Sequence, residues 1–209
     1  MVVSYSHTDD PTGTVSFPNL QFLHVNGEFP IRFMESLSAP NLKSLQAFGF
    51  KVFPHNENPF ADPSQFPGLL MLEVELDGSR DVAATLALPF LRAHKELYSV
   101  RLPWSLSQEE DLVEVLGSTS LLPNLEHVGI NDDFPELKGA EMLLERRVLQ
   151  GPMQGDQHEE MKGFRLCLRA DTDTYDRTQR SVARLVEKFG DSVNCGVRFD
   201  IPWGWPFEV

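Results

Sequence analysis

The sequence predicts an α/β fold, a leucine-rich-repeat solenoid of about six to seven repeats. Five segments share the pattern Leu-x-x-Leu-x-Leu or a close variant of it, and four of them begin with proline. Their first leucines are Leu20, Leu42, Leu69, Leu97 and Leu125, so the steps between them are 22, 27, 28 and 28 residues. A repeat of this length headed by this pattern is typical of stacked leucine-rich units.

Each of these segments is expected to form a short parallel strand. The leucines recur at a strand period of two, which points them into the core and leaves the residues between them on an outward, concave face. The steps are long enough for the crossover that parallel strands require, which we expect to be a helix or an irregular turn on the convex side. The recurrent Pro-Asn start should fix the approach to the strand, with asparagine bonding its own nearby backbone.

Helical patterns lie between the strands. Ile31, Met34 and Leu37 stand at helical spacing, and a helix is expected in segment 79–93 with Pro89 at its end. A capping box of Ser107 and Glu110 predicts a further helix, which Gly117 closes. Its expected core residues are Leu112, Val113, Val115 and Leu116.

The C-terminal part continues the alternation. A helix is predicted at 140–149 with Met142, Leu143 and Leu144 inward, and a strand begins near Phe164. Tyr175 to Phe189 is predicted to be a helix and Val193 to Ile201 a seventh strand. The apolar residues expected to anchor that helix are Val182, Leu185, Val186 and Phe189.

The whole chain, 1–209, is interpreted as a single domain. Residues 1–16 are a lead-in or cap, 17–149 are regular repeats, 150–163 are a polar loop, and 164–209 hold the C-terminal repeats and an aromatic cap. A second proline-rich loop is expected from Lys51 to Phe66. The cap is built on Trp203, Trp205 and Phe207, for which a docking tail is the alternative.

Composition excludes several functional classes. The formal charge of −13 disfavours nucleic acid as a partner. No apolar run is long enough to span a membrane, and residues 1–13 are too polar for a secretory signal. The two cysteines, Cys167 and Cys195, are expected on opposite faces of adjacent strands and so unpaired, which favours a cytoplasmic or nuclear compartment.

The candidate binding surface is the outward set of residues on successive strands. Aromatic residues and methionine lie toward its N-terminal end, carboxylates at its centre and arginines at its C-terminal end, although all of them are also compatible with an ordinary solvated surface. The predicted partner-binding residues are Phe22, His24, Asn26, Gln46, Phe48, Met71, Glu73, Glu75, Arg101, His127, Asn131, Arg165 and Arg169. Ser44 and Ser99 share their spacing.

Catalytic and metal-binding patterns are weak. His24 and His127 lie four strands apart, about 19 Å at the spacing of strands in a sheet, which is too far for one metal ion. His158-Glu-Glu160 lacks the second histidine of a zinc motif. Cys167 lies between Arg165 and Arg169, but a thiol enzyme would also need a positioned base. We therefore expect no catalytic residue, no metal and no cofactor.

The chain resembles a known family from about Phe17 to Ala170. Pro-Asn-Leu-x-x-Leu starts, together with Phe90-Leu-Arg-Ala-His94 leading into Leu97, resemble the leucine-rich-repeat region of F-box-type proteins of mushroom-forming fungi. The resemblance implies a substrate-holding repeat domain, which in the family is joined to an F-box that binds a ubiquitin-ligase adaptor. Residues 1–16 are too short for an F-box, so adaptor binding is expected only if one exists elsewhere in the intact protein.

Three functions follow from these observations. The first is a non-catalytic scaffold that binds another protein on the concave face. The second is the substrate-recognition part of a ubiquitin ligase whose F-box is absent from this chain. The third and most remote is a thiol-dependent enzyme using Cys167.

Overall fold

A parallel sheet in chain order forms the body of the protein. The computed structural model describes residues 14–26, 36–51, 65–77, 88–102, 110–131, 137–149, 164–169, 175–189 and 194–197. Within these residues, seven strands pair in the order β2-β4-β5-β6-β7-β8-β9, each parallel to its neighbours. The predicted α/β fold with parallel strands is confirmed. The strands are β2 (Phe22–Asn26), β4 (Ser44–Lys51), β5 (Met71–Asp77), β6 (Ser99–Leu102), β7 (His127–Asn131), β8 (Arg165–Arg169) and β9 (Asn194–Val197).

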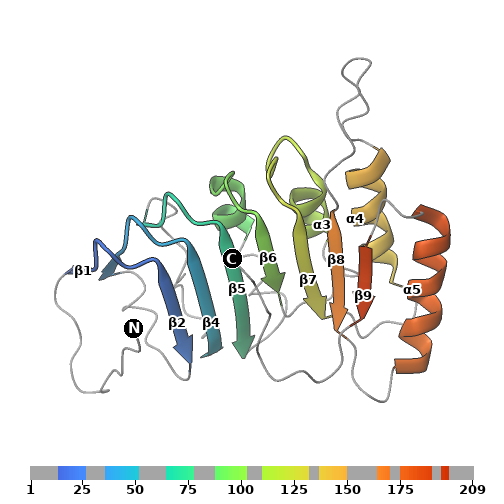
Figure 1. The fold of residues 1–209 in the computed structure, drawn as a ribbon, viewed down its shortest axis with the longest axis horizontal. Coiled ribbons are helices and arrows are strands. Elements are labelled where there is room, and N and C mark those ends of the chain that lie inside the picture. The colour runs from blue at the N-terminus through green and yellow to red at the C-terminus, as the bar shows by residue number, and fades with distance from the viewer. Residues whose placement is uncertain are drawn as a thin grey trace.

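Helices and a small second sheet complete the described fold. α3 (Glu110–Gly117) packs against α4 (Lys138–Leu149), which contacts α5 (Tyr175–Phe189). The short strands β1 (Val15–Ser16) and β3 (Leu37–Ser38) pair with each other in parallel. Figure 1 shows the sheet as one row from blue to red, with the three helices gathered toward its C-terminal end. No helix among the described residues has the length and apolar character needed to cross a membrane.

The strand register repeats the spacing seen in the sequence. Phe22 pairs with Ser44, Ser44 with Met71, Met71 with Ser99, and Ser99 with His127, which gives steps of 22, 27, 28 and 28 residues. These are the steps between the first leucines of the five segments. Equivalent positions of successive segments therefore lie side by side.

The inward leucines form the core, as their spacing predicts. The second apolar position of each pattern is buried in every strand from β2 to β8, in the register Leu23, Leu45, Leu72, Val100, Val128 and Leu166. The first leucine is fully or almost fully buried in four segments, whereas Leu20 of the first segment is only partly buried.

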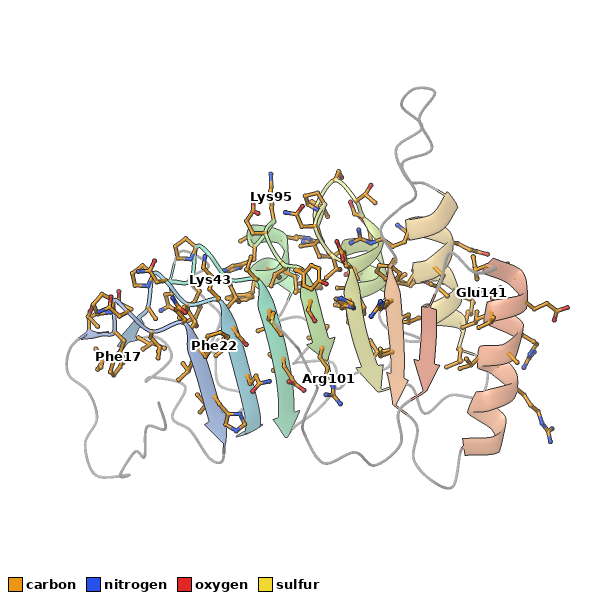
Figure 2. All side chains as sticks on the ribbon, viewed as in Figure 1. Phe17, Phe22, Lys43, Lys95, Arg101 and Glu141 are labelled. Carbon is orange, nitrogen blue, oxygen red and sulfur yellow. The ribbon has the colours of Figure 1, made fainter. Side chains whose placement is uncertain are left out.

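One turn precedes each of the five strands from β2 to β7. The backbone N–H of the first leucine donates to the carbonyl three residues earlier, as in Leu20 to Phe17 and Leu42 to Ala39. Proline and asparagine occupy the two central positions in three of the five turns, and proline's fixed φ suits the first of them. The same bond joins Leu97 to His94 although that turn has no proline. Lys43 and Lys95 mark these turns along the upper edge of the sheet in Figure 2.

The asparagine of the turn acts between units, which corrects the prediction of a bond to its own nearby backbone. Asn41 Nδ2 donates to the Pro18 carbonyl of the preceding turn at 2.7 Å. Lys43 Nζ reaches forward in a similar way to the Gly68 carbonyl at 3.2 Å. These bonds link each turn to its neighbour at the edge of the sheet.

Two predicted helix details are wrong. Residues 88–93 are helical, so the helix continues beyond Pro89 instead of ending there. Proline tolerates helical geometry when its ring replaces an N–H that the first turn does not use, so its presence alone does not locate a C-terminus. Leu37 lies in β3 and not in a helix, where it is buried against the core.

Other helix predictions agree with the structure. α5 has the predicted bounds, although its Val186 is 39% exposed and does not join the core. The four apolar residues expected to face inward from α3 are buried. Gly117 ends α3, where a Cβ atom would lie 2.8 Å from Arg146 Cδ, so glycine permits the close approach of α4. The predicted features at 31–35, 79–87, Ser107, 150–163 and 202–207 lie outside the described residues.

A buried arginine joins α3, α4 and the turn before β7. Arg147 of α4 is 3% exposed. Its Nε donates to the Leu116 carbonyl at 2.7 Å, and both terminal nitrogens donate to the Leu122 carbonyl at 3.1 Å. Its guanidinium also lies 5.5 Å from the centre of the Phe164 ring. Burial lowers the pKa of Arg147 to about 10, so it stays charged at neutral pH.

A buried histidine occupies a core position of the repeated turn. His94 stands where other turns carry Ala39, Phe66 and Leu122, all fully buried. Its ring stacks on Phe90 at 3.9 Å, and Nδ1 donates to the Phe90 carbonyl at 2.7 Å. Nε2 is buried with no hydrogen-bond partner among the described residues, so the site holds a neutral imidazole.

His94 is expected to make the fold sensitive to acid. Burial lowers its pKa below the ordinary value of 6.5, partly offset by its backbone hydrogen bonds. The unfolded chain therefore binds a proton on His94 below about pH 6.5 that the folded chain does not bind, and stability falls as the pH drops through this range. His94→Leu, which copies Leu122, should lose less stability than the wild type between pH 7 and pH 5 in urea titrations. Equal losses in the two proteins would contradict this assignment.

Candidate partner-binding face

The outward residues of the strands form rows across the face of the sheet opposite the inward leucines, here called the open face. The register defines a first row through Phe22, a second row through His24 and a third row through Asn26. The first row is Phe22, Ser44, Met71, Ser99, His127 and Arg165; the second is His24, Gln46, Glu73, Arg101, Gly129 and Cys167. In the third row, Asn26, Phe48 and Glu75 are in register, as are Asn131 and Arg169.

All thirteen predicted residues therefore lie on these rows. Phe22, His24 and Arg165 are exposed, and Gln46, Met71, Glu73 and Arg101 are half-buried. The five predicted members of the third row are placed by backbone register alone. The face that the alternation predicts is thus continuous across the strands.

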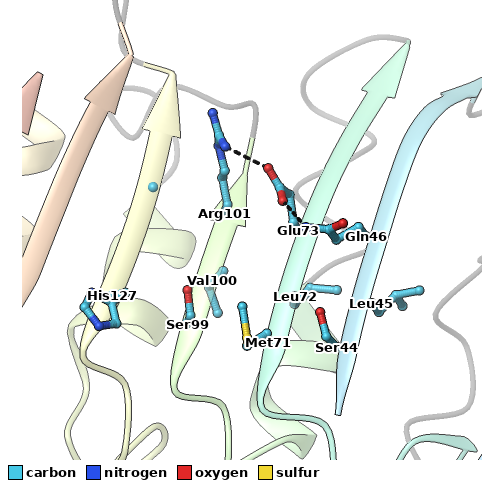
Figure 3. Close-up of a pocket in the computed structure, with 11 residues that line it drawn as sticks. Ser44, Leu45, Gln46, Met71, Leu72, Glu73, Ser99, Val100, Arg101 and His127 are labelled. Atoms are coloured by element: carbon cyan, nitrogen blue, oxygen red, sulfur yellow. Dashed lines mark hydrogen bonds and ion pairs between the residues drawn. The ribbon is translucent and has the colours of Figure 1, made fainter. Parts of the chain in front are cut away.

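A chain of hydrogen bonds follows the second row across four strands. His24 Nδ1 lies 3.1 Å from Gln46 Oε1, and Gln46 Nε2 donates to Glu73 Oε2 at 2.9 Å. Arg101 completes the chain by donating to the other carboxylate oxygen of Glu73 at 2.8 Å. Figure 3 shows the Glu73 carboxylate between Gln46 and Arg101. We call this series of side chains the polar ladder.

The polar ladder was not predicted, although the repeat contains the signal for it. Steps of 22, 27 and 28 residues lead from His24 to Gln46, Glu73 and Arg101. Alternation identifies the face of a strand, whereas the step identifies the partner on the next strand. Using both would have placed these side chains next to one another.

Beyond Arg101 the second row becomes nearly bare. Gly129 is the register partner of Arg101, and a Cβ atom at Gly129 would lie 3.0 Å from Arg101 Cγ. The aliphatic stem of Arg101 therefore covers Gly129. Cys167 and Gly196 continue the row on β8 and β9. A shallow pocket covers the middle of the open face, lined by residues of β4 to β7 that include Ser44, Met71, Ser99 and His127.

His127 was predicted to be available to a partner, but it is only 8% exposed. Its Nε2 lies 2.7 Å from the Tyr98 hydroxyl, and the two rings meet edge to face at 4.8 Å. Burial lowers the pKa of His127, and the positive charge of Arg165 adds to this effect. Its Nδ1 has no hydrogen-bond partner within the part of the chain that the structure describes. His127 is therefore a support of the face and not an exposed contact.

Tyr98 is a residue of the site that the sequence pattern did not indicate. It directly precedes β6, where strand alternation does not yet assign a side. Burial raises its pKa, and the neighbouring Glu126 carboxylate, which accepts a hydrogen bond from its hydroxyl, raises it further. Tyr98 thus links Glu126 to His127 at the edge of the open face.

Other predicted chemistry can be placed in part. The register pairs Cys195 with Leu166 and Cys167 with Gly196, so the cysteines occupy alternate positions on adjacent strands, as expected. The positions beside Cys167 on both neighbouring strands are glycines. His24 and His127 lie in different rows on β2 and β7, and the described residues contain no cluster of three potential metal ligands. His158 and Glu160 lie outside the described residues.

Comparison with other proteins adds no family to this description. No protein-family model, no curated protein and no solved structure matches the chain. Its function therefore has to be inferred from its own residues and geometry.

Proposed function

We propose that this chain is a non-catalytic leucine-rich-repeat scaffold that binds a partner protein on its open face. The chain-ordered parallel strands, the inward leucines and the repeated turn support a solenoid of stacked units. In such an architecture the open face is the concave side. A rigid curved sheet offers a broad surface that several rows of side chains can share.

The observation that carries the proposal is the polar ladder. Three hydrogen bonds hold four side chains from four adjacent strands in fixed positions. Ordering a long side chain during binding costs about 0.5–1.5 kcal/mol, so a surface that is ordered beforehand avoids much of that cost. The Glu73–Arg101 pair is also satisfied internally, so a partner does not have to neutralise a lone charge at the centre.

The exposed N-terminal end of the face provides an apolar contact next to the polar ladder. Phe22 is 61% exposed, the highest value among the large hydrophobic residues described as exposed. It lies on β2 two residues before His24, the first residue of the ladder. An aromatic anchor beside ordered polar groups is a common composition for the energetic centre of a protein interface.

Substitutions at this end test the proposal. A partner captured with the intact chain from its source cell is identified by mass spectrometry, and its Kd is then measured with purified protein. Phe22→Ser and His24→Ala are each expected to raise the Kd about tenfold, which corresponds to about 1.4 kcal/mol. Both side chains are exposed, so the melting temperature should change little.

Val186→Ser is the matched control, because Val186 is also an exposed apolar residue but lies on α5. Its Kd is expected to equal that of the wild type. Wild-type affinity in both open-face variants, with a loss in Val186→Ser, would move the binding site to the helical side.

A further inference from the structure

The C-terminal end of the open face has the opposite charge balance to the whole chain. The protein has 31 acidic and 18 basic side chains. On β7, β8 and β9, however, the open-face positions include two arginines and no carboxylate. These positions are His127, Gly129, Asn131, Arg165, Cys167, Arg169, Asn194 and Gly196. We call this part of the face the arginine end.

Arg165 is the accessible cation of the arginine end. Its side chain is exposed, and no carboxylate among the described residues forms an ion pair with it. Its charge reaches the first row, where it helps to lower the pKa of His127. Glu126, directly before β7, is hydrogen-bonded to Tyr98, and Glu73 is bonded to Gln46 and Arg101. The described carboxylates around the face are thus engaged elsewhere.

The floor beside Arg165 is low. The second row continues through Gly129, Cys167 and Gly196, whose side chains are absent or small. A partner segment can therefore approach the sheet closely at this point. Arg169 stands four residues from Arg165 on β8, about 13 Å along an extended strand.

We propose that the arginine end receives an acidic segment of the partner protein. This inference rests on the proposed function and adds the chemistry of the partner to it. A carboxylate of the segment binds the Arg165 guanidinium, and a second anionic side chain four residues away reaches the position of Arg169 when the segment runs along β8. A phosphorylated side chain presents the same anionic chemistry with more charge.

A second group of cations provides the control. Arg180 and Arg184 lie exposed on α5, where Lys188 is paired with Glu141 and Glu145 of α4. Removing Arg180 changes the net charge of the protein by the same amount as removing Arg165. A difference between the two variants therefore reports a local site and not the overall field.

Fluorescence anisotropy with synthetic peptides tests the inference. The probe is a labelled peptide of glycine and serine with two glutamates four residues apart; matched peptides carry two glutamines or two phosphoserines. At low salt, the glutamate peptide is expected to bind wild-type protein about fivefold more tightly than the glutamine peptide, because paired charges act strongly when they are weakly screened. Arg165→Gln should remove that preference, whereas Arg180→Gln should retain it.

The phosphoserine peptide separates the two sources of negative charge. Tighter binding that Arg165→Gln abolishes supports the site and indicates a phosphorylated segment. Equal binding of glutamate and glutamine peptides overturns the inference, as does an equal loss in Arg165→Gln and Arg180→Gln. Tighter binding of a labelled single-stranded oligonucleotide than of any peptide also overturns it. If these peptides fail while Phe22→Ser still weakens the captured partner, the proposed function stands and the acidic segment alone is rejected.

Discussion

Replacing Arg147 with alanine is expected to lower the free energy of unfolding by about 3 kcal/mol. The guanidinium donates to the Leu116 carbonyl near the end of α3 and to the Leu122 carbonyl in the turn before β7. Alanine leaves both carbonyls without this donor and also removes the stem of a side chain that is 3% exposed. For a chain of this size, the melting temperature should fall by about 6–12 °C.

Arg147→Met separates the two contributions. Methionine retains much of the aliphatic stem but no donor, and it also relieves the cost of burying a charge, so about half of the loss should remain. Arg180→Ala is the control, because Arg180 is exposed on α5 and should change stability by less than about 0.5 kcal/mol. Urea unfolding measures all three variants. Wild-type stability in Arg147→Ala would show that α3 and the turn are held by packing alone.

Two adjacent leucines are expected to respond very differently to the same substitution. Leu69→Ala should cost about 3 kcal/mol, because Leu69 has no exposed surface and its loss opens a cavity in the stacked core. Leu70 is 37% exposed, and Leu70→Ala should cost less than about 1 kcal/mol. The chemical change and the chain position are almost identical, so the contrast measures the environment of the first leucine in the repeat.

Denaturant titration of the two variants gives this contrast directly. The midpoints should differ while the slopes agree, because the surface exposed on unfolding is nearly the same. Similar losses of stability in both variants would contradict the assignment of Leu69 to the core. A changed slope in Leu69→Ala would indicate that part of the stack unfolds separately.

The repeat made the arrangement of strands predictable, because its spacing is also the strand register. Alternation within each segment separated Leu72 from Glu73 and placed the predicted binding residues on one face. The bounds of α5 followed from its apolar period and the glycine after it. These features depend on local pattern and on a constant step.

Features that depend on side chains from other units were not predictable in this way. His127 has the alternation of an outward residue, yet Tyr98, 29 residues earlier, approaches it closely. His94 and Arg147 read as polar residues, but one replaces a hydrophobic residue in a repeated turn and the other bonds carbonyls 25 and 31 residues away. Alternation and periodicity do not encode such distant contacts.

The sequential order of the sheet also governs how the molecule responds to damage. In the seven-stranded sheet, each inner strand pairs with the neighbours that precede and follow it there in the chain, and β2 and β9 never meet. A lesion at β6 would therefore interrupt cooperativity between the two halves and leave each of them with its internal pairings. Melting would then proceed as in a zipper opened from the middle, with two fronts moving outward toward the termini.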